Sequence, residues 1–225
     1  FILIIAGITM VVGVLGAIAQ TDMKRILSFH IVSQIGYMVL GLGLFTVAGI
    51  GAAILFVVNQ VVLKSTLLLT AGMVDHGAGS SRINDVGGLA RRFPLVGWLF
   101  LLPALSLAGI PPFSGFVAKL SVVEAGFGGD EWLVVGVALA VSVLTLYSMT
   151  KIWGGVFWGE VQVVAVPEDR STERFGGTVP MLAATGALVV GSVALAVLSG
   201  PLFDLCQRAA DDLLHPAAYV EEVLP

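Results

Sequence analysis

The sequence predicts an all-α, polytopic membrane protein with six transmembrane helices, one of which is broken at Pro111-Pro112. Of its 225 residues, 57% are apolar and only 12% are charged, whereas soluble domains carry about 25% charged residues. Long apolar runs alternate with short polar connections along most of the chain. We assign the runs to helices because an open sheet in lipid would leave its backbone hydrogen-bonding groups unsatisfied.

Six apolar runs are long enough to cross the hydrocarbon core of a bilayer, which requires about 20 residues in a helix. We therefore expect a transmembrane bundle over residues 1–203 and an acidic, amphipathic tail over residues 204–225. Because Phe1 already lies within an apolar run, we expect the C-terminal part of a longer polytopic chain; the alternative is a short protein with a trimmed start. The expected spans are Phe1–Ala19, Ile26–Val47, Ile50–Val74, Leu95–Phe127, Trp132–Trp158 and Val179–Phe203.

Lys and Arg are confined to alternate connections between the expected spans. The second and fourth connections contain neither residue, and the tail contains only Arg208. Because cytoplasmic loops are enriched in these cations, we expect the first, third and fifth connections in the cytoplasm and the tail outside the cell. The cations of these three connections are Lys24, Arg25, Arg82, Arg91, Arg92, Arg170 and Arg174.

The fourth span, Leu95–Phe127, is too long for one straight crossing. At 1.5 Å per residue it would measure roughly 50 Å, whereas the hydrocarbon core is about 30 Å thick. It contains "AGIPPFSGF", in which Pro111 and Pro112 are adjacent. Two prolines remove two backbone donors and clash with the preceding turn, so we expect two half-helices joined by an unwound link. The alternative is a proline kink in one long tilted helix.

Two lysines lie deep within the expected spans. Lys64 is about ten residues, roughly 15 Å, from either end of its helix, so its amine cannot easily reach the membrane surface. Lys119 follows the proline pair by about two turns. Ionisable groups inside a membrane usually face a bundle interior or a hydrated path, and a buried amine can exchange its proton near neutral pH. We interpret both as proton-relay residues; the alternative is static pairing or snorkelling.

Polar residues near these lysines suggest a hydrated interior. Gln60 lies one turn before Lys64, with Asn59 beside it, so Gln60 shares the face of the lysine. A second stripe at helical spacing in "FHIVSQIGYM" could hold a chain of waters, and its histidine titrates naturally near neutral pH. The alternative for this histidine is a hydrogen-bonded structural role. The stripe consists of His30, Ser33, Gln34 and Tyr37.

Three further charged groups receive simpler interpretations. Glu124 either pairs with Lys119, lines an outer exit for ions, or is an interfacial carboxylate in water. Lys151 is expected to snorkel to the inner surface. Asp22 is expected to cap the second span.

Several kinds of chemistry leave no trace in the sequence. It has no Gly-rich phosphate loop, no zinc-type His/Glu cluster and no pair of histidines placed for haem. A single cysteine, Cys206, excludes an internal disulfide and a multi-cysteine metal site. We expect no metal, no cofactor, no enzymatic chemistry and no nucleic-acid partner.

These residues together resemble the proton-translocating antiporter-like subunits shared by respiratory complex I, membrane-bound hydrogenases and Mrp-type multisubunit cation/proton antiporters. The closing "HPAAYVEEVLP" is similar to the end of an Mrp-type member. The segments that carry the wider resemblance, in the order of the family, are "AQTDMKRILSFHIVSQIGYMVLGLGL", "VVLKSTLLLTAG" and "LPALSLAGIPPFSGFVAKL".

The resemblance implies a fold of fourteen helices with two inverted five-helix repeats, of which this chain would supply the last six helices. It also implies a multi-pass location in the bacterial inner membrane, among the other subunits of a hetero-oligomeric complex that exchanges Na⁺ for H⁺. The central lysine of the family matches Lys64, and the lysine after the helix break matches Lys119. Protons would pass from the first to the second, and the chain alone would not transport.

One departure and two alternatives accompany the resemblance. Many relatives carry a histidine where this chain has Gln60, so a relay here would use waters or His30. The first alternative is a proton-pumping subunit of complex I or of a hydrogenase, without a redox centre of its own. The second is a membrane scaffold in which the lysines are inert.

Overall fold

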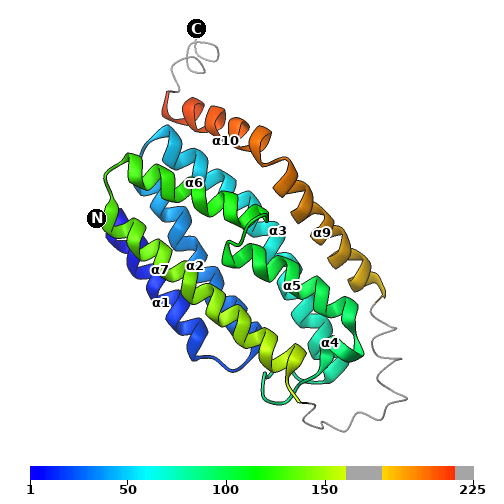
Figure 1. Cartoon of the computed structure of the whole chain (residues 1–225). Coiled ribbons are helices and arrows are strands. Elements are labelled where there is room, and N and C mark those ends of the chain that lie inside the picture. The colour runs from blue at the N-terminus through cyan, green and yellow to red at the C-terminus, as the bar shows by residue number, and fades with distance from the viewer. Residues whose placement is uncertain (161–178, 216–225) are drawn as a thin grey trace.

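A computed structural model describes residues 1–160 and 179–215, and every regular element within them is a helix (Figure 1). Arg170 and Arg174 of the fifth connection and residues 216–225 of the expected tail lie outside the described residues. The helices are α1 (Ile2–Ala19), α2 (Met23–Gly43), α3 (Val47–Ala78), α4 (Leu89–Arg92), α5 (Pro94–Ala108), α6 (Ser114–Gly128), α7 (Trp132–Ile152), the π-helical segment η1 (Trp153–Trp158), α9 (Val179–Val197) and α10 (Ser199–Leu214).

Five of the described helices are long and apolar enough to cross a membrane. They are α1, α2, α3, α7 continued by η1, and α9. The helix α3 is longer than its expected span at both ends, because it begins at Val47 behind its cap Thr46 and continues through Ala78 to the left-handed Gly79. The chain is thus an all-helical membrane protein with five candidate spans.

The interruption expected in the fourth segment is confirmed. The helix α5 ends at Ala108 and α6 begins at Ser114, and neither is long enough to be a candidate span by itself. The peptide bond between Pro111 and Pro112 is cis. The Oγ atom of Ser106 in α5 accepts a hydrogen bond of 3.0 Å from the backbone N–H of Gly115, so the start of α6 is held against the end of α5.

The expected end of the last span at Phe203 is wrong. The helix α9 ends at Val197, and α10 begins at Ser199, ahead of the expected tail boundary at residue 204. The reason is Pro201, which has no N–H to donate to the carbonyl of Val197 and is tolerated only in the first turn of a new helix. The helix α10 then lies against α3 and buries Cys206 and Ala210, so it is amphipathic.

The helix α3 lies at the centre of the bundle and contacts α2, α5, α6, α9 and α10. Figure 1 shows α9 and α10 along one side of the bundle, with α1, α2 and α7 on the other. Because α3 is surrounded on most sides, polar residues near its middle are removed from the lipid. This position brings Lys64 into the interior.

The helices α1 and α2 approach closely at two glycines. A Cβ atom at Gly36 would lie 2.8 Å from the backbone N of Met10, and one at Gly13 would lie 2.6 Å from the Cα of Ser33. Small residues at such crossings let helix backbones pack closely in membranes, where no hydrophobic effect drives helices together.

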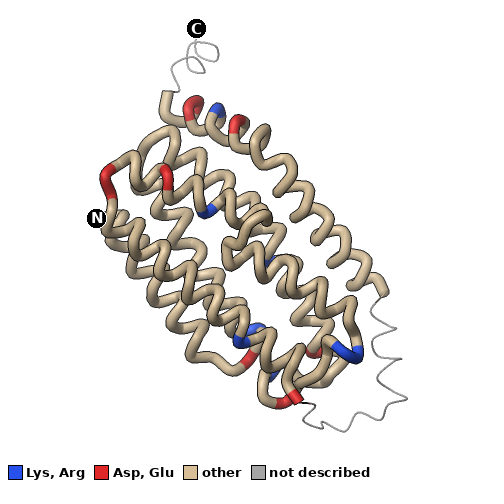
Figure 2. Tube along the Cα trace, viewed as in Figure 1, with Lys and Arg blue, Asp and Glu red and all other residues tan. Residues whose placement is uncertain are grey.

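Charged residues gather near the ends of the bundle (Figure 2). At the end where α1 joins α2, the Asp22 side chain accepts a 3.0 Å hydrogen bond from the backbone N–H of Arg25, which confirms the expected cap. Ser81 also donates to Asp22, and Lys24 forms an ion pair with Asp75 at the end of α3. The first and third connections are therefore fastened together.

We expect Gly36→Ala to destabilise the protein by about 1–3 kcal/mol, because the added methyl group overpacks the crossing of α1 and α2. The measurement is the melting temperature of the purified membrane protein in detergent. The control is Gly136→Ala in α7, where no heavy atom lies within 4 Å of the added carbon. This variant should be neutral or slightly stabilising; equal losses in both variants would contradict the close crossing.

Candidate functional site: a buried polar band with two lysines

Polar side chains from α2, α3 and α6 gather inside the bundle. All of them are less than one-tenth exposed, although they lie in apolar helices. The sequence predicted each of them except Ser114. They are His30, Ser33 and Gln34 of α2, Asn59, Gln60 and Lys64 of α3, and Ser114 and Lys119 of α6.

The α2 stripe is bound to its neighbours at three points. His30 Nε2 is hydrogen-bonded to the Ser148 hydroxyl of α7. Ser33 donates a 2.9 Å hydrogen bond to the carbonyl of Met10 in α1. The Tyr37 hydroxyl donates to the carbonyl of Ala138 in α7. The stripe thus faces the interior, as expected from its helical spacing.

Several polar atoms of the band have no hydrogen-bond partner among the described residues of the protein. In folded proteins, more than 90% of buried polar groups bond to protein or to ordered water, and a buried water requires two to four such partners. This concentration of free donors and acceptors in one region is typical of an interior that binds water. The atoms are His30 Nδ1, Gln34 Nε2 and Oε1, Asn59 Nδ2, Gln60 Oε1 and Lys64 Nζ.

Lys64 occupies the middle of this band. Its side chain is 8% exposed, and its amine has no hydrogen-bond partner among the described residues. Lys64 and Lys119 are close enough to interact electrostatically, and both act on His30. The structure therefore brings the three predicted relay residues within electrostatic range of one another.

Lys119, in contrast, has well-defined partners. Its amine donates a 3.1 Å hydrogen bond to the carbonyl of Ala108 and a 2.8 Å hydrogen bond to the Ser142 hydroxyl of α7. The amine also lies 5.5 Å from the centre of the Tyr37 ring, in the range of a cation–π interaction.

Gly109 makes room for the side chain of Lys119. Its φ of 85° is in the left-handed region, and a Cβ atom there would lie 2.8 Å from Lys119 Cδ. Glycine is therefore required at this position both for the turn that ends α5 and for the passage of the lysine stem.

A second set of contacts ties the helix break to α3. The Ser114 hydroxyl donates a 3.1 Å hydrogen bond to Asn59 Oδ1, and it lies 3.3 Å from the Ser106 hydroxyl. Asn59 is about one turn from Lys64 on the same helix. The start of α6 and the middle of α3 thus share one hydrogen-bonded connection.

Glu124 does not pair with Lys119, so that possibility is wrong. Five residues along a helix correspond to a rotation of about 140°, which places the two side chains on different faces. Glu124 is exposed and lines a separate cavity of about 300 Å³, beside Thr46 of the α2–α3 connection and Phe203 of α10.

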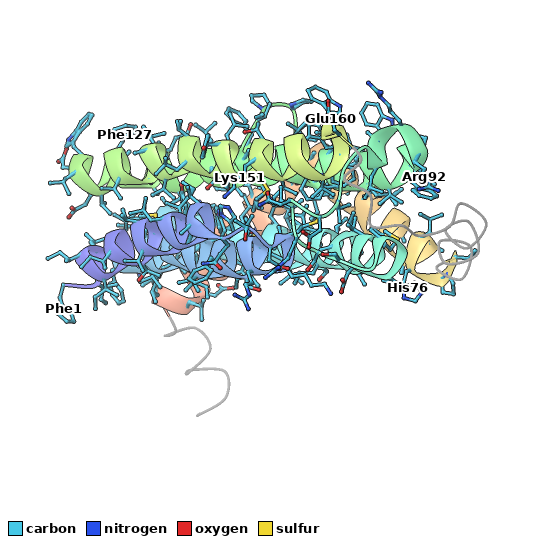
Figure 3. All side chains as sticks on the ribbon, turned by 90° about the horizontal axis from the view of Figure 1, so that it is seen from below. Phe1, His76, Arg92, Phe127, Lys151 and Glu160 are labelled. Atoms are coloured by element: carbon cyan, nitrogen blue, oxygen red, sulfur yellow. The ribbon has the colours of Figure 1, made fainter. Side chains whose placement is uncertain are left out.

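Lys151 also differs from its expected role. Instead of extending to the surface, its amine donates hydrogen bonds of 2.8 Å and 2.7 Å to the carbonyls of Ile18 and Gln20. These carbonyls belong to the end of α1, which lacks intrahelical donors and carries partial negative charge. Figure 3 shows Lys151 between the layer of α7 and that of α1.

Sequence reasoning missed Ser142, Ser148 and the carbonyl of Ala108. A single serine in an apolar span has no periodic partner that would attract notice, and a backbone carbonyl has no sequence signal of its own. The proline at position 112 was the available clue for Ala108, because it removes the donor that this carbonyl would have in a helix.

The fold and the band define a polytopic helical membrane protein with ionisable groups in its interior. The chain belongs to the family described as NADH:quinone oxidoreductase/Mrp antiporter transmembrane proteins, whose model matches residues 1–145.

Similar proteins extend the match over the whole chain. The Na⁺/H⁺ antiporter subunit designated D in Alkalihalophilus pseudofirmus is 41% identical over 99% of this chain and 44% of its own length. Its namesake in Bacillus subtilis is 31% identical over 98% of this chain and 43% of its own length. A chain in the structure of an Mrp complex from Dietzia sp. superposes with a TM-score of 0.87 at 35% identity, over 100% of this chain and 49% of that chain. The chain thus spans less than half the length of these relatives.

We expect Gly109→Ala to lower the melting temperature, because left-handed backbone costs a residue with a Cβ atom about 1–2 kcal/mol and the new methyl group meets the Lys119 stem. The control is Gly128→Ala at the end of α6, where nothing lies within 4 Å of the added carbon. An unchanged melting temperature in Gly109→Ala would contradict the described path of Lys119.

Proposed function

We propose that the chain is part of the D-type subunit of an Mrp-type Na⁺/H⁺ antiporter in the cell membrane, and that it relays protons through Lys64, Lys119 and His30. Similarity to the D-type relatives over nearly the whole chain supports the assignment within the family. In this proposal α5 and α6 together make a sixth crossing, and the whole protein has the fourteen-helix fold of the family. The remaining subunits of the complex are its partners.

The observation that carries the relay is the set of unpartnered polar atoms around Lys64. A charged amine without a partner in a membrane interior is costly, and water held by the surrounding amides and imidazole would reduce that cost. The same water would connect Lys64 with His30 on one side and with the Ser114 end of α6 on the other. In this scheme Gln34, Asn59 and Gln60 hold the water, and no protein carboxylate is required.

Transport belongs to the assembled complex in this proposal, because the chain spans only 44% of the length of its A. pseudofirmus relative. Glu124 and its cavity near the start of α3 would lie on the outer side, as the positive-inside rule orients the chain. Whether Na⁺ crosses through these residues or through a neighbouring subunit is a separate question, and the proposal assigns only the proton to them.

The family description also names NADH:quinone oxidoreductases, so a proton-pumping subunit of a redox complex is the second candidate. The two candidates differ in their partners. Co-purification of iron–sulfur or NADH-oxidising subunits with this chain would favour the redox complex, whereas their absence from an active antiporter would favour the Mrp assignment.

We expect Lys64→Met and Lys119→Met each to reduce Na⁺/H⁺ antiport by the intact complex by at least about tenfold, since each removes a proton-binding group from the path. The assay follows the collapse of a pH gradient in membrane vesicles after Na⁺ is added. Arg208→Met is the matched control, because Arg208 is a cation of α10 outside the band, and this variant should keep full antiport. Full antiport in both lysine variants would refute the relay.

We also expect Lys64→Met to leave the melting temperature of the complex unchanged or to raise it, because it replaces an unpartnered buried amine by an apolar side chain of similar length. This measurement separates lost transport from lost folding. A large fall in melting temperature would mean that Lys64 is held by a stabilising partner, contrary to the proposed hydrated environment.

A further inference from the structure

The helix break provides one backbone carbonyl that an unbroken helix would not. In an α-helix, the carbonyl of residue 108 would accept from the N–H of residue 112. That residue is Pro112, which has no N–H. The carbonyl of Ala108 is buried within the bundle and accepts instead from Lys119 Nζ at 3.1 Å and from Ser142 Oγ at 3.0 Å.

Ser142 completes a closed arrangement around the lysine amine. Its hydroxyl donates its proton to the carbonyl of Ala108, so its lone pairs are free to accept from Lys119 Nζ at 2.8 Å. An ammonium group has three donors and no acceptor. Here it meets a carbonyl, a hydroxyl oxygen and the face of the Tyr37 ring, all of which favour the protonated form.

The two buried lysines therefore differ in their surroundings. Lys119 has acceptors supplied by α5 and α7, while Lys64 has none among the described residues. Charge-assisted hydrogen bonds are about twice as strong as neutral ones, and two like charges in proximity disfavour simultaneous protonation. A single proton shared by the pair is thus more stable on Lys119.

We propose that Ser142 is a positioning residue that, together with the carbonyl of Ala108, holds the Lys119 ammonium at the helix break and so makes Lys119 the preferred proton holder of the pair. This inference rests on the proposed relay. Pro112 has a chemical role in it, since its missing N–H frees the carbonyl, and Gly109 lets the lysine stem pass.

Few other titratable groups face this arrangement. The helix α2 contributes Tyr37, and α3 contributes Lys64. The helices α5 and α9, which also pack against α6, contain no titratable residue. On α7 the group that reaches the amine is the neutral hydroxyl of Ser142. A change of pH dependence on removing this hydroxyl is therefore attributable to Lys119 and Lys64.

The first test is a double-mutant cycle for stability that does not depend on transport. The melting temperatures of the wild-type complex, Ser142→Ala, Lys119→Met and the double variant are compared. We expect the effect of Ser142→Ala to differ between the two lysine backgrounds by about 2–4 °C, because contacting residues are not additive. Additive effects would overturn the proposed contact.

The second test is the pH profile of antiport. Without the hydroxyl, the protonated amine loses an acceptor, so we expect the alkaline limb of the profile in Ser142→Ala to move to lower pH by about one unit. Ser142→Thr keeps the hydroxyl and should restore the wild-type profile. The matched control is Thr145→Val on the same helix, whose buried hydroxyl bonds only to the carbonyl of Val141 in its own turn.

The outcomes separate this inference from the proposed function. Thermal coupling with a displaced profile that Ser142→Thr restores supports the inference. Coupling with an unchanged profile overturns it and leaves Ser142 a purely structural contact. If Lys64→Met and Lys119→Met keep full antiport, the relay itself fails and the inference fails with it, whatever the cycle shows.

Discussion

The arrangement of the bundle depends on how two amines are accommodated where lipid and apolar side chains exclude bulk water. An isolated cation in this environment is costly, and α3 and α6 each carry one. The two are treated differently. Lys119 is bound by a carbonyl, a hydroxyl and an aromatic ring, whereas Lys64 lies among amides and an imidazole that have free hydrogen-bonding atoms of their own.

The break between α5 and α6 links these two environments. It frees the carbonyl that receives Lys119, and its far side is tied to α3 through Ser114 and Asn59, about one turn from Lys64. Irregular backbone within a membrane survives only where protein or water satisfies it. Here each of the contacts that satisfies the break also belongs to the polar band, so the stability of the break and the placement of the lysines are the same problem.

The periphery of the bundle serves a different purpose. Lys151 holds the end of α1 against α7, the Lys24–Asp75 ion pair joins the first and third connections, and α10 covers α3. None of these contacts involves the polar band. The charged groups near the surface therefore fix the helices in place, and the groups inside remain available for protons.

The sequence by itself determined the helical class, the position of the break and the burial of the two lysines with the α2 stripe. These properties follow from hydropathy, proline chemistry and the period of a helix, which are all local. Only the tertiary structure decided that Lys119 meets Ser142, that His30 meets Ser148, that Lys151 caps α1 and that Glu124 faces elsewhere. Those partners belong to helices far apart along the chain, and the choice among them depends on how the helices pack, which no single helical pattern contains.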